Sequence, residues 1–156
     1  MNIRMQKRIV VPFVDASVDA PIIKAYYGVD KFVYALVDTG SEISMIDKNF
    51  VESTKKMGPL FKDMFFRSPQ SEKMQMIGLA GIREVPVVKT TTLLHFDDTS
   101  IADRIKFTAI EMDFDMISQR KNAPDNEDIS IIIGNDFLTK RKAKLDFGAG
   151  ELSIRK

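Results

Sequence analysis

Short apolar runs separated by polar turns follow one another along this chain, and most of them have the character of β-strands. The run Lys31–Val37 is rich in β-branched, aromatic and aliphatic residues, which favour a pleated, half-buried surface. Similar runs predict strands at Ile9–Val14, Ile22–Tyr27 and Ile105–Met112, and Gly28-Val29-Asp30 predicts a hairpin connection. The chain is therefore expected to begin as an all-β structure.

A few segments have a helical pattern instead. Residues 47–56 are expected to form a helix that Gly58-Pro59 ends, and a second short helix is expected over Leu60–Phe65. Towards the C-terminus, the β-branched run Ile129–Ile133 passes through glycine into a short amphipathic helix. Helices are thus expected to be few and short.

Two further hairpins are predicted. The arms of the first are Met74–Gly78 and Ile82–Phe96, and a polar loop is expected later at Ser118–Asp128. The arms of the second, Ala143–Phe147 and Glu151–Ile154, alternate polar and apolar residues with the period of a strand that is buried on one side. The second hairpin is expected either to complete the core or to form a subunit interface.

Candidate chemistry appears where the run Lys31–Val37 ends in Asp38-Thr39-Gly40-Ser41. Gly40 permits a tight turn that a β-carbon would oppose, so the carboxylate of Asp38 is expected to be held at a strand end. An ordinary turn with side-chain to backbone hydrogen bonds would explain the same residues. Two glycine-containing segments follow along the chain, Met76–Ile82 and Ile129–Leu138.

These three segments, in this order and spacing, resemble the retropepsins, the single-domain aspartic peptidases of retroviruses and their cellular relatives. The resemblance covers about Ile22 to Ile154. It implies a mostly β fold: a closed β-barrel with a flap hairpin and one to three short helices, acting as a homodimer. A single domain is expected over residues 1–156, and a flexible N-terminal segment over about residues 1–8 is left open.

The resemblance also implies a role for each segment. Asp38 would be the catalytic carboxylate, and Thr39, Gly40 and Ser41 would complete its turn and support the dimer. The implied flap and substrate-binding residues are Met76, Ile77, Gly78, Leu79, Ala80 and Gly81, and the implied supports of the active-site loop are Ile132, Ile133 and Gly134. A Ser41 hydroxyl that donates to the carboxylate would lower the pKa of Asp38 and favour an acidic optimum.

The number of candidate catalytic carboxylates predicts a dimer. Cleavage by this chemistry needs two carboxylates, whereas the chain has one Asp-Thr-Gly; Asp146 precedes Phe147-Gly148, and Asp97-Asp98-Thr99-Ser100 has no glycine. Asp38 from each of two copies is therefore expected to meet at a two-fold axis and activate a water that attacks an extended peptide. Self-cleavage or polyprotein processing is compatible with the sequence but is not specified by it.

Composition limits the other functional classes. The chain has 156 residues, no cysteine, one histidine and a net charge of +1, so disulfides, thiol catalysis and a histidine-rich metal site are excluded. No cofactor, metal, nucleic-acid or membrane partner is expected. The apolar run Ile9–Pro12 is too brief for a signal peptide, which favours a cytoplasmic or particle-enclosed protein.

Two alternatives stay open. The chain could be a weak or inactive retropepsin-like module for dimerisation or peptide binding, or a small β-rich structural protein that contains the three motifs by chance. One departure is visible: Asn135 follows Gly134 where viral members commonly have an arginine that pairs with an acidic residue near the catalytic turn. Asn135 cannot form the corresponding ion pair.

Overall fold

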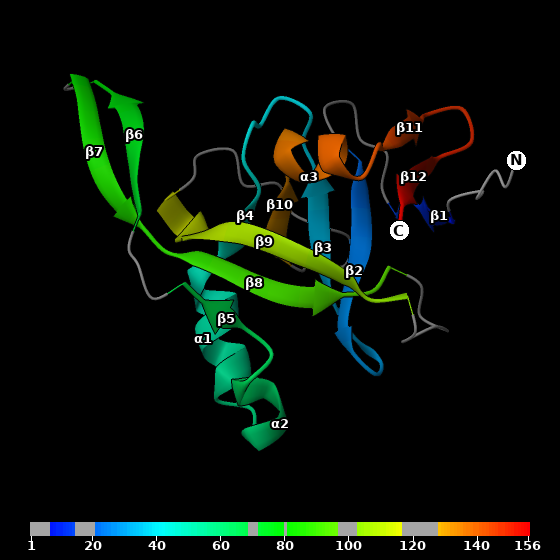
Figure 1. Ribbon diagram of the computed structural model, residues 1–156, viewed down its shortest axis with the longest axis horizontal. Coiled ribbons are helices and arrows are strands. Elements are labelled where there is room, and N and C mark those ends of the chain that lie inside the picture. Colours follow the sequence, from blue (N-terminus) through cyan, green and yellow to red (C-terminus); the bar gives the residue numbers. More distant parts are fainter. Residues whose placement is uncertain (1–6, 15–20, 69–71, 80, 97–102, 117–127) are drawn as a thin grey trace, which may run out of the picture.

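The computed structural model describes residues 7–14, 21–68, 72–79, 81–96, 103–116 and 128–156 (Figure 1). Among these residues the strands form a seven-stranded sheet in the order β2-β3-β10-β4-β9-β8-β5, a three-stranded sheet β1-β12-β11 and the hairpin β6-β7. The strands are β1 (Arg8–Pro12), β2 (Ile22–Gly28), β3 (Lys31–Val37), β4 (Met45–Asp47), β5 (Phe66–Arg67), β6 (Glu72–Gly78), β7 (Gly81–Val87), β8 (Lys89–Leu94), β9 (Ile105–Met112), β10 (Ile129–Ile133), β11 (Lys144–Asp146) and β12 (Glu151–Arg155). The helices are α1 (Lys48–Lys55), α2 (Pro59–Lys62), α3 (Asn135–Lys140) and the 3-10 turn η2 (Phe114–Met116).

The mostly β character and several element bounds agree with the sequence. The predicted bounds of β3 and β9 are confirmed, and β1 ends at Pro12 instead of Val14. Because β1 already begins at Arg8, the N-terminal segment considered for residues 1–8 overlaps this strand; residues 1–6 lie outside the described part. The predicted loop Ser118–Asp128 also lies outside it, except for Asp128.

The structure corrects the predicted arm Ile82–Phe96. The chain leaves the β6-β7 hairpin at Val87, and after Val88 it enters the large sheet as β8, which pairs with β9. Apart from Gly81, both strands lie within the run that was predicted as one arm, and they differ in the partners with which they pair. Hydrogen bonding shows the change of partner, since the Glu111 amide donates to the Val88 carbonyl at 2.9 Å.

The first two helices are also shorter than expected. Asp47 caps α1 instead of belonging to it, because its side chain accepts a hydrogen bond from the Asn49 amide. The second helix, α2, ends at Lys62, so the prediction that it extends to Phe65 is wrong. Phe65 is nevertheless buried and packs edge-on against Phe50 of α1.

Strand β10 lies between two strands that are close neighbours in the sequence. It runs parallel to β3, with Ile133 opposite Val37, and antiparallel to β4, with Ile131 opposite Ile46. The segment of residues 38–44, which joins β3 to β4, must therefore pass over the end of β10. This threading places the Asp38 turn beside the start of α3.

The large sheet curls into a half-barrel. Its first strand meets β8 at an isolated bridge in which Tyr26 and His95 exchange two backbone hydrogen bonds of 2.8 and 2.9 Å. His95 is buried and stacks on the Tyr26 ring with 5.3 Å between centroids, which gives the histidine a structural role. The main core contains side chains of the large sheet, the terminal sheet and α3, and Phe137 of α3 packs edge-on against Phe107.

The C-terminal hairpin is half in the core. Leu152 and Ile154 of β12 are fully buried, as the alternation predicts. Phe147, which the pattern places on the same face as Leu145, is 63% exposed at the hairpin end and touches the ring of Phe13. The centre of the hairpin therefore belongs to the core, whereas its tip is exposed in the single copy.

A carboxylate joins the two ends of the described chain. Lys7 and Lys156 donate to Asp103 Oδ1 at 2.7 and 2.9 Å, and the Lys156 amide donates to the Lys7 carbonyl at 3.0 Å. The hydrogen bonds from Lys7 and Lys156 hold the pKa of Asp103 below its ordinary value of 3.8. A lowered pKa in the folded state means that this carboxylate stabilises the fold at neutral pH and stops doing so as the pH falls through the lowered pKa.

We expect Asp103→Asn to lower the melting temperature at neutral pH, and the difference from wild type to disappear in strong acid. Thermal unfolding followed by circular dichroism over a pH series measures both. Asp63→Asn is the matched control, because Asp63 is exposed next to α2. A difference between Asp103→Asn and wild type that is the same at every pH would contradict the assigned cause.

Candidate active site

Asp38 follows the last residue of β3 directly, and backbone hydrogen bonds fix it there. Its amide donates to the Ile133 carbonyl at 2.9 Å, which continues the ladder between β3 and β10. The Gly40 amide donates to Asp38 Oδ1 at 2.9 Å, and the Ser41 amide donates to the Asp38 carbonyl at 3.2 Å. Asp38 is half-buried, whereas Thr39 and Gly40 are exposed. The carboxylate is thus oriented by its own turn at the surface of the chain.

Gly40 lets the turn close tightly. A β-carbon at this position would lie 3.2 Å from Asp38 Oδ1, which is closer than ordinary packing allows. The bond from the Gly40 amide is also the one that an ordinary aspartate turn makes. The turn alone therefore does not identify the chemistry, and its surroundings have to be considered.

Gly134, between β10 and α3, supports the turn by close approach. A β-carbon on Gly134 would lie 2.7 Å from the carbonyl carbon of Ile43 and 2.8 Å from the Ser41 oxygen. The next residue, Asn135, donates from its amide to the Ser41 carbonyl at 2.8 Å and from Nδ2 to the Thr39 carbonyl at 2.6 Å. Ile132 and Ile133, the other two residues expected to support the loop, belong to β10, and Ile133 receives the Asp38 amide.

The far end of the turn is fixed by a buried hydroxyl. Ser44 is fully buried, and its Oγ donates to Asp136 Oδ1 at 2.6 Å while accepting from the Gly134 amide at 3.0 Å. Asp136 Oδ1 also accepts from the Phe137 amide at 2.8 Å. Sequence reasoning missed the contacts of Ser44, Asn135 and Asp136. The available signal was the preference of Asn and Asp for the beginning of a helix.

The expected hydrogen bond from the Ser41 hydroxyl to the Asp38 carboxylate is wrong. Its hydroxyl donates to the Ile43 carbonyl at 2.7 Å, and a hydroxyl has one hydrogen to donate. The Asp38 carboxylate therefore receives the Gly40 amide and not the Ser41 hydroxyl. The acidic pH optimum of activity was expected because of a hydrogen bond that Ser41 does not make. The Ser41 hydroxyl bonds within the turn instead.

The β6-β7 hairpin holds the other predicted site residues. Its strands pair in continuous register from Glu72 opposite Val87 to Gly78 opposite Gly81. Gly81 has φ 103°, which side chains disfavour, and Leu79 at the tip is fully exposed. Met76, Ile77 and Gly78 are described by their backbone alone, and Ala80 lies outside the described residues. In Figure 1 the hairpin points towards the top of the view, where β3 also ends.

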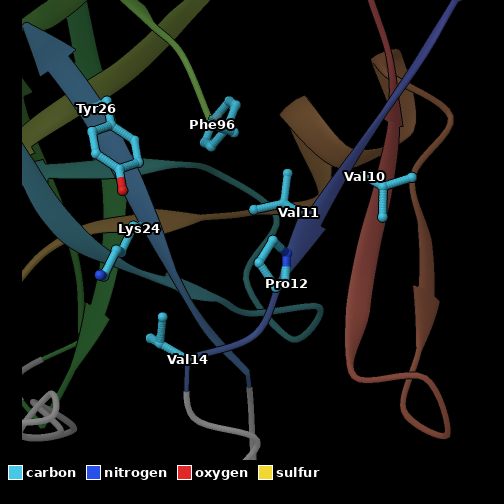
Figure 2. A pocket seen from close by; sticks show the side chains of 7 residues that line it. All are labelled: Val10, Val11, Pro12, Val14, Lys24, Tyr26 and Phe96. Atoms are coloured by element: carbon cyan, nitrogen blue, oxygen red, sulfur yellow. The ribbon is translucent and has the colours of Figure 1, made fainter. Parts of the chain in front are cut away.

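Three hollows lie elsewhere on the chain. Figure 2 shows one of about 340 Å³ where Val10, Val11 and Pro12 of β1 face Lys24 and Tyr26 of β2. A second, of about 510 Å³, lies beside β3 and α1, and a third, of about 370 Å³, lies beside α2 and β8. Asp38 lines none of these three.

Metal ligands are not grouped in the described part of the chain. No set of three or more histidine, cysteine, aspartate or glutamate side chains there could hold a metal ion. Within the same residues, no helix has the length and apolar character that a membrane span requires.

Comparison with protein-family models gives no match, and comparison with curated proteins gives none either. Solved structures do match. A retropepsin-like aspartic protease from Rickettsia conorii is 14% identical, with coverage of 99% of this chain and 96% of its own and a TM-score of 0.49. The retroviral protease-like domain of Ddi1 from Leishmania major is 14% identical, with coverage of 89% and 92% and a TM-score of 0.47.

Both neighbours are of the retropepsin type. This is the family that the three motifs resemble. At such low identity and TM-score, neither neighbour tells which reaction this chain carries out.

Proposed function

We propose that this chain is one subunit of a homodimeric aspartic endopeptidase, in which the Asp38 carboxylates of two copies activate one water to hydrolyse a peptide bond. The observation that carries the proposal is the held carboxylate itself. Asp38 is oriented by the Gly40 amide at 2.9 Å and by the ladder to β10, next to an exposed Thr39. Preorganised acidic groups at a surface turn suit acid-base chemistry on a bound peptide.

The second carboxylate is proposed to come from a second copy because Asp136 and Asp146, the candidates in the described part of the chain, make other hydrogen bonds. Asp136 lies beside the turn, but it accepts hydrogen bonds from Ser44 and Phe137. Asp146 caps the end of the C-terminal hairpin, with Oδ1 accepting from the Ala149 amide at 2.9 Å. An isologous dimer brings two identical turns together at its axis without any further motif.

The chemistry follows from placing two like acids close together. Both cannot easily carry charge, so they share one proton. The ionised member takes a proton from water as that water attacks the peptide carbonyl, and the protonated member donates to the developing oxyanion. Thr39, exposed in the single copy, is proposed to hydrogen-bond across the axis and keep the two turns in register.

The substrate is proposed to be an extended peptide covered by the β6-β7 hairpin, which would act as the flap. An extended backbone can pair as an added strand, while its side chains occupy apolar subsites. Leu79 is fully exposed at the tip, and Met74 is partly exposed on β6. These two side chains, with Met76 and Ile77, are the proposed contacts to substrate.

A diverse peptide pool tests the activity. Products identified by mass spectrometry are expected with wild type and not with Asp38→Asn, at acidic and at neutral pH. Peptides that bind wild type without being cleaved would instead support the alternative of an inactive binding module. Cleavage by Asp38→Asn at the wild-type rate would refute the proposal.

Mixing subunits tests the shared site. In about a ninefold excess of Asp38→Asn, wild-type activity is expected to fall to roughly one tenth, since most wild-type copies then pair with an inactive partner. The rate of cleavage of a single reporter peptide measures this after the dimers have exchanged subunits. The same excess of Asp146→Asn should raise the activity, because that variant keeps its Asp38. An unchanged rate in the presence of Asp38→Asn would show that each copy works alone.

A further inference from the structure

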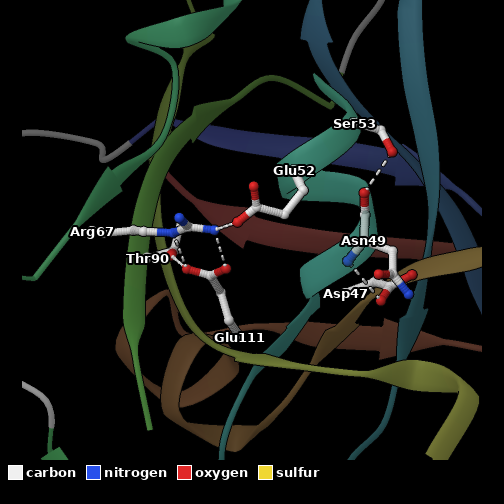
Figure 3. A network of polar contacts seen from close by, with 7 residues as sticks. All are labelled: Asp47, Asn49, Glu52, Ser53, Arg67, Thr90 and Glu111. Atoms are coloured by element: carbon white, nitrogen blue, oxygen red, sulfur yellow. Dashed lines mark hydrogen bonds and ion pairs between the residues drawn. The ribbon is translucent and has the colours of Figure 1, made fainter. Parts of the chain in front are cut away.

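An ion cluster joins four elements near the base of the β6-β7 hairpin (Figure 3). Arg67 of β5 donates to both carboxylate oxygens of Glu111 on β9, at 2.7 Å from Nε and 2.8 Å from Nη2. Arg67 Nη2 also donates to Glu52 of α1, and the Thr90 hydroxyl of β8 donates to Glu111. The Glu111 side chain is 5% exposed and that of Arg67 33%. Planar bidentate pairs of this kind fix geometry as well as supply energy.

Backbone hydrogen bonds at or next to this cluster hold residues that come before β6 and after β7 in the sequence. On the entering side, Arg67 is followed by Ser68, whose amide donates to the Lys89 carbonyl at 2.9 Å. On the leaving side, the Val88 carbonyl accepts from the Glu111 amide at 2.9 Å. Glu111 therefore binds the segment before β6 through its side chain and the segment after β7 through its backbone.

The same residue is close in the chain to the support of the Asp38 turn. Its neighbour Ile110 donates from its amide to the Ser44 carbonyl at 3.0 Å, and Ser44 in turn is bonded to Asp136 and Gly134. Strand β9 also runs parallel to β4 with Glu111 opposite Ile46. A short hydrogen-bonded path thus runs from the base of the hairpin to the end of the Asp38 turn.

The charges at the cluster stabilise one another. The hydrogen bonds to Glu111 and then to Glu52 raise the pKa of Arg67, and the bond from Arg67 lowers the pKa of Glu52. Removing Arg67 would leave the Glu111 carboxylate buried with Thr90 as its other side-chain partner. Buried carboxylates that lose their cation either rearrange or draw in water, and here the nearest segments to move are the two attachments of the hairpin.

We propose that Arg67 and Glu111 are positioning residues that fix the base of the β6-β7 hairpin relative to the Asp38 turn, so that the hairpin closes over the peptide in the right place. The inference rests on the proposed function, since it assigns these residues to the peptidase reaction. Neither residue is proposed to touch the substrate.

Steady-state kinetics separates positioning from general stability. In Arg67→Gln and Glu111→Gln, KM for a reporter peptide is expected to rise about tenfold while kcat falls less, because the hairpin contacts the peptide and the Asp38 turn is intact. Arg67→Lys should lie between wild type and Arg67→Gln, since an ammonium keeps the charge but not the bidentate geometry. Arg104→Gln, at an exposed arginine, is the matched control and should leave KM unchanged. Equal losses in kcat and in kcat/KM would overturn the assignment.

Hydrogen exchange gives a readout that needs no activity. Amides of β6 and β7 are expected to exchange about tenfold faster in Arg67→Gln than in wild type, with those of β3 and β10 unchanged. Unchanged hairpin exchange, or equal acceleration in all strands, would show that the cluster only stabilises the fold. If wild type cleaves no peptide, the proposed function fails, and the exchange measurement still decides whether Arg67 holds the hairpin.

Discussion

Asp38→Asn is expected to reduce peptide cleavage by roughly 10²- to 10⁴-fold, the range that a positioned acid or base contributes. An amide is isosteric with the carboxylate but can neither accept the proton of water nor share a proton with its partner. The turn should survive, because the amide oxygen of asparagine can accept from the Gly40 amide as Asp38 Oδ1 does at 2.9 Å. Initial rates with a reporter peptide measure the loss, and analytical ultracentrifugation shows whether the dimer persists.

Asp146→Asn is the matched control for this loss. Asp146 also ends a strand and accepts a backbone amide, from Ala149 at 2.9 Å, so the same chemical change is made in a similar turn. The control should keep wild-type activity. If both variants lost activity equally, the effect would come from a general change in stability or charge and not from the chemistry of Asp38.

Gly134→Ala is expected to destabilise the fold by roughly 1–3 kcal/mol, the cost of forcing extra volume into a tightly packed place. The added carbon would meet backbone atoms of Ile43 and Ser41 at 2.7 and 2.8 Å, and backbone cannot rotate away as a side chain can. The resulting shift should also disturb the bonds from Asn135 to the turn, so activity should fall further than the loss of folded protein explains. Denaturant unfolding and initial rates measure the two effects.

Gly28→Ala provides the comparison. The nearest atom to a β-carbon at Gly28 is Lys31 Cβ at 3.8 Å, which is ordinary contact. Both glycines have backbone angles that an alanine can adopt, since the positive φ values of described glycines occur at other positions. Gly28→Ala should therefore be close to neutral in stability and activity. A Gly134→Ala variant as stable and active as Gly28→Ala would show that the turn tolerates displacement.

Local signals were sufficient for much of the secondary structure. The composition of Lys31–Val37 and the abrupt change at Asp38 located both β3 and the turn, because strand propensity and turn chemistry act over a few residues. The separation of β7 from β8 could not be found in this way. The two strands differ in the distant partners, β6 and β9, with which they pair.

The same contrast between local signals and distant contacts applies to the candidate site. The carboxylate and the glycine of the turn follow from residue type, whereas the partner of a hydroxyl depends on which acceptor lies nearest in three dimensions. The Ser41 hydroxyl had two acceptors within reach along the chain, and it donates to the Ile43 carbonyl. Asn135 stands where an arginine was expected from the resemblance, so the ion pair near the turn was expected to be absent. The amide side chain of Asn135 donates to the Thr39 carbonyl instead.

The placement of β10 between β3 and β4 has a consequence for the order of folding. The bond from Asn135 to Thr39 closes a separation of 96 positions, and contacts of such long range form slowly because loop closure costs entropy first. A polypeptide emerging from the ribosome carries its Asp-Thr-Gly early, but without the later strand and helix that hold it. The Asp38 turn would thus gain its support only after β10 and α3 have been synthesised and β10 has inserted between β3 and β4.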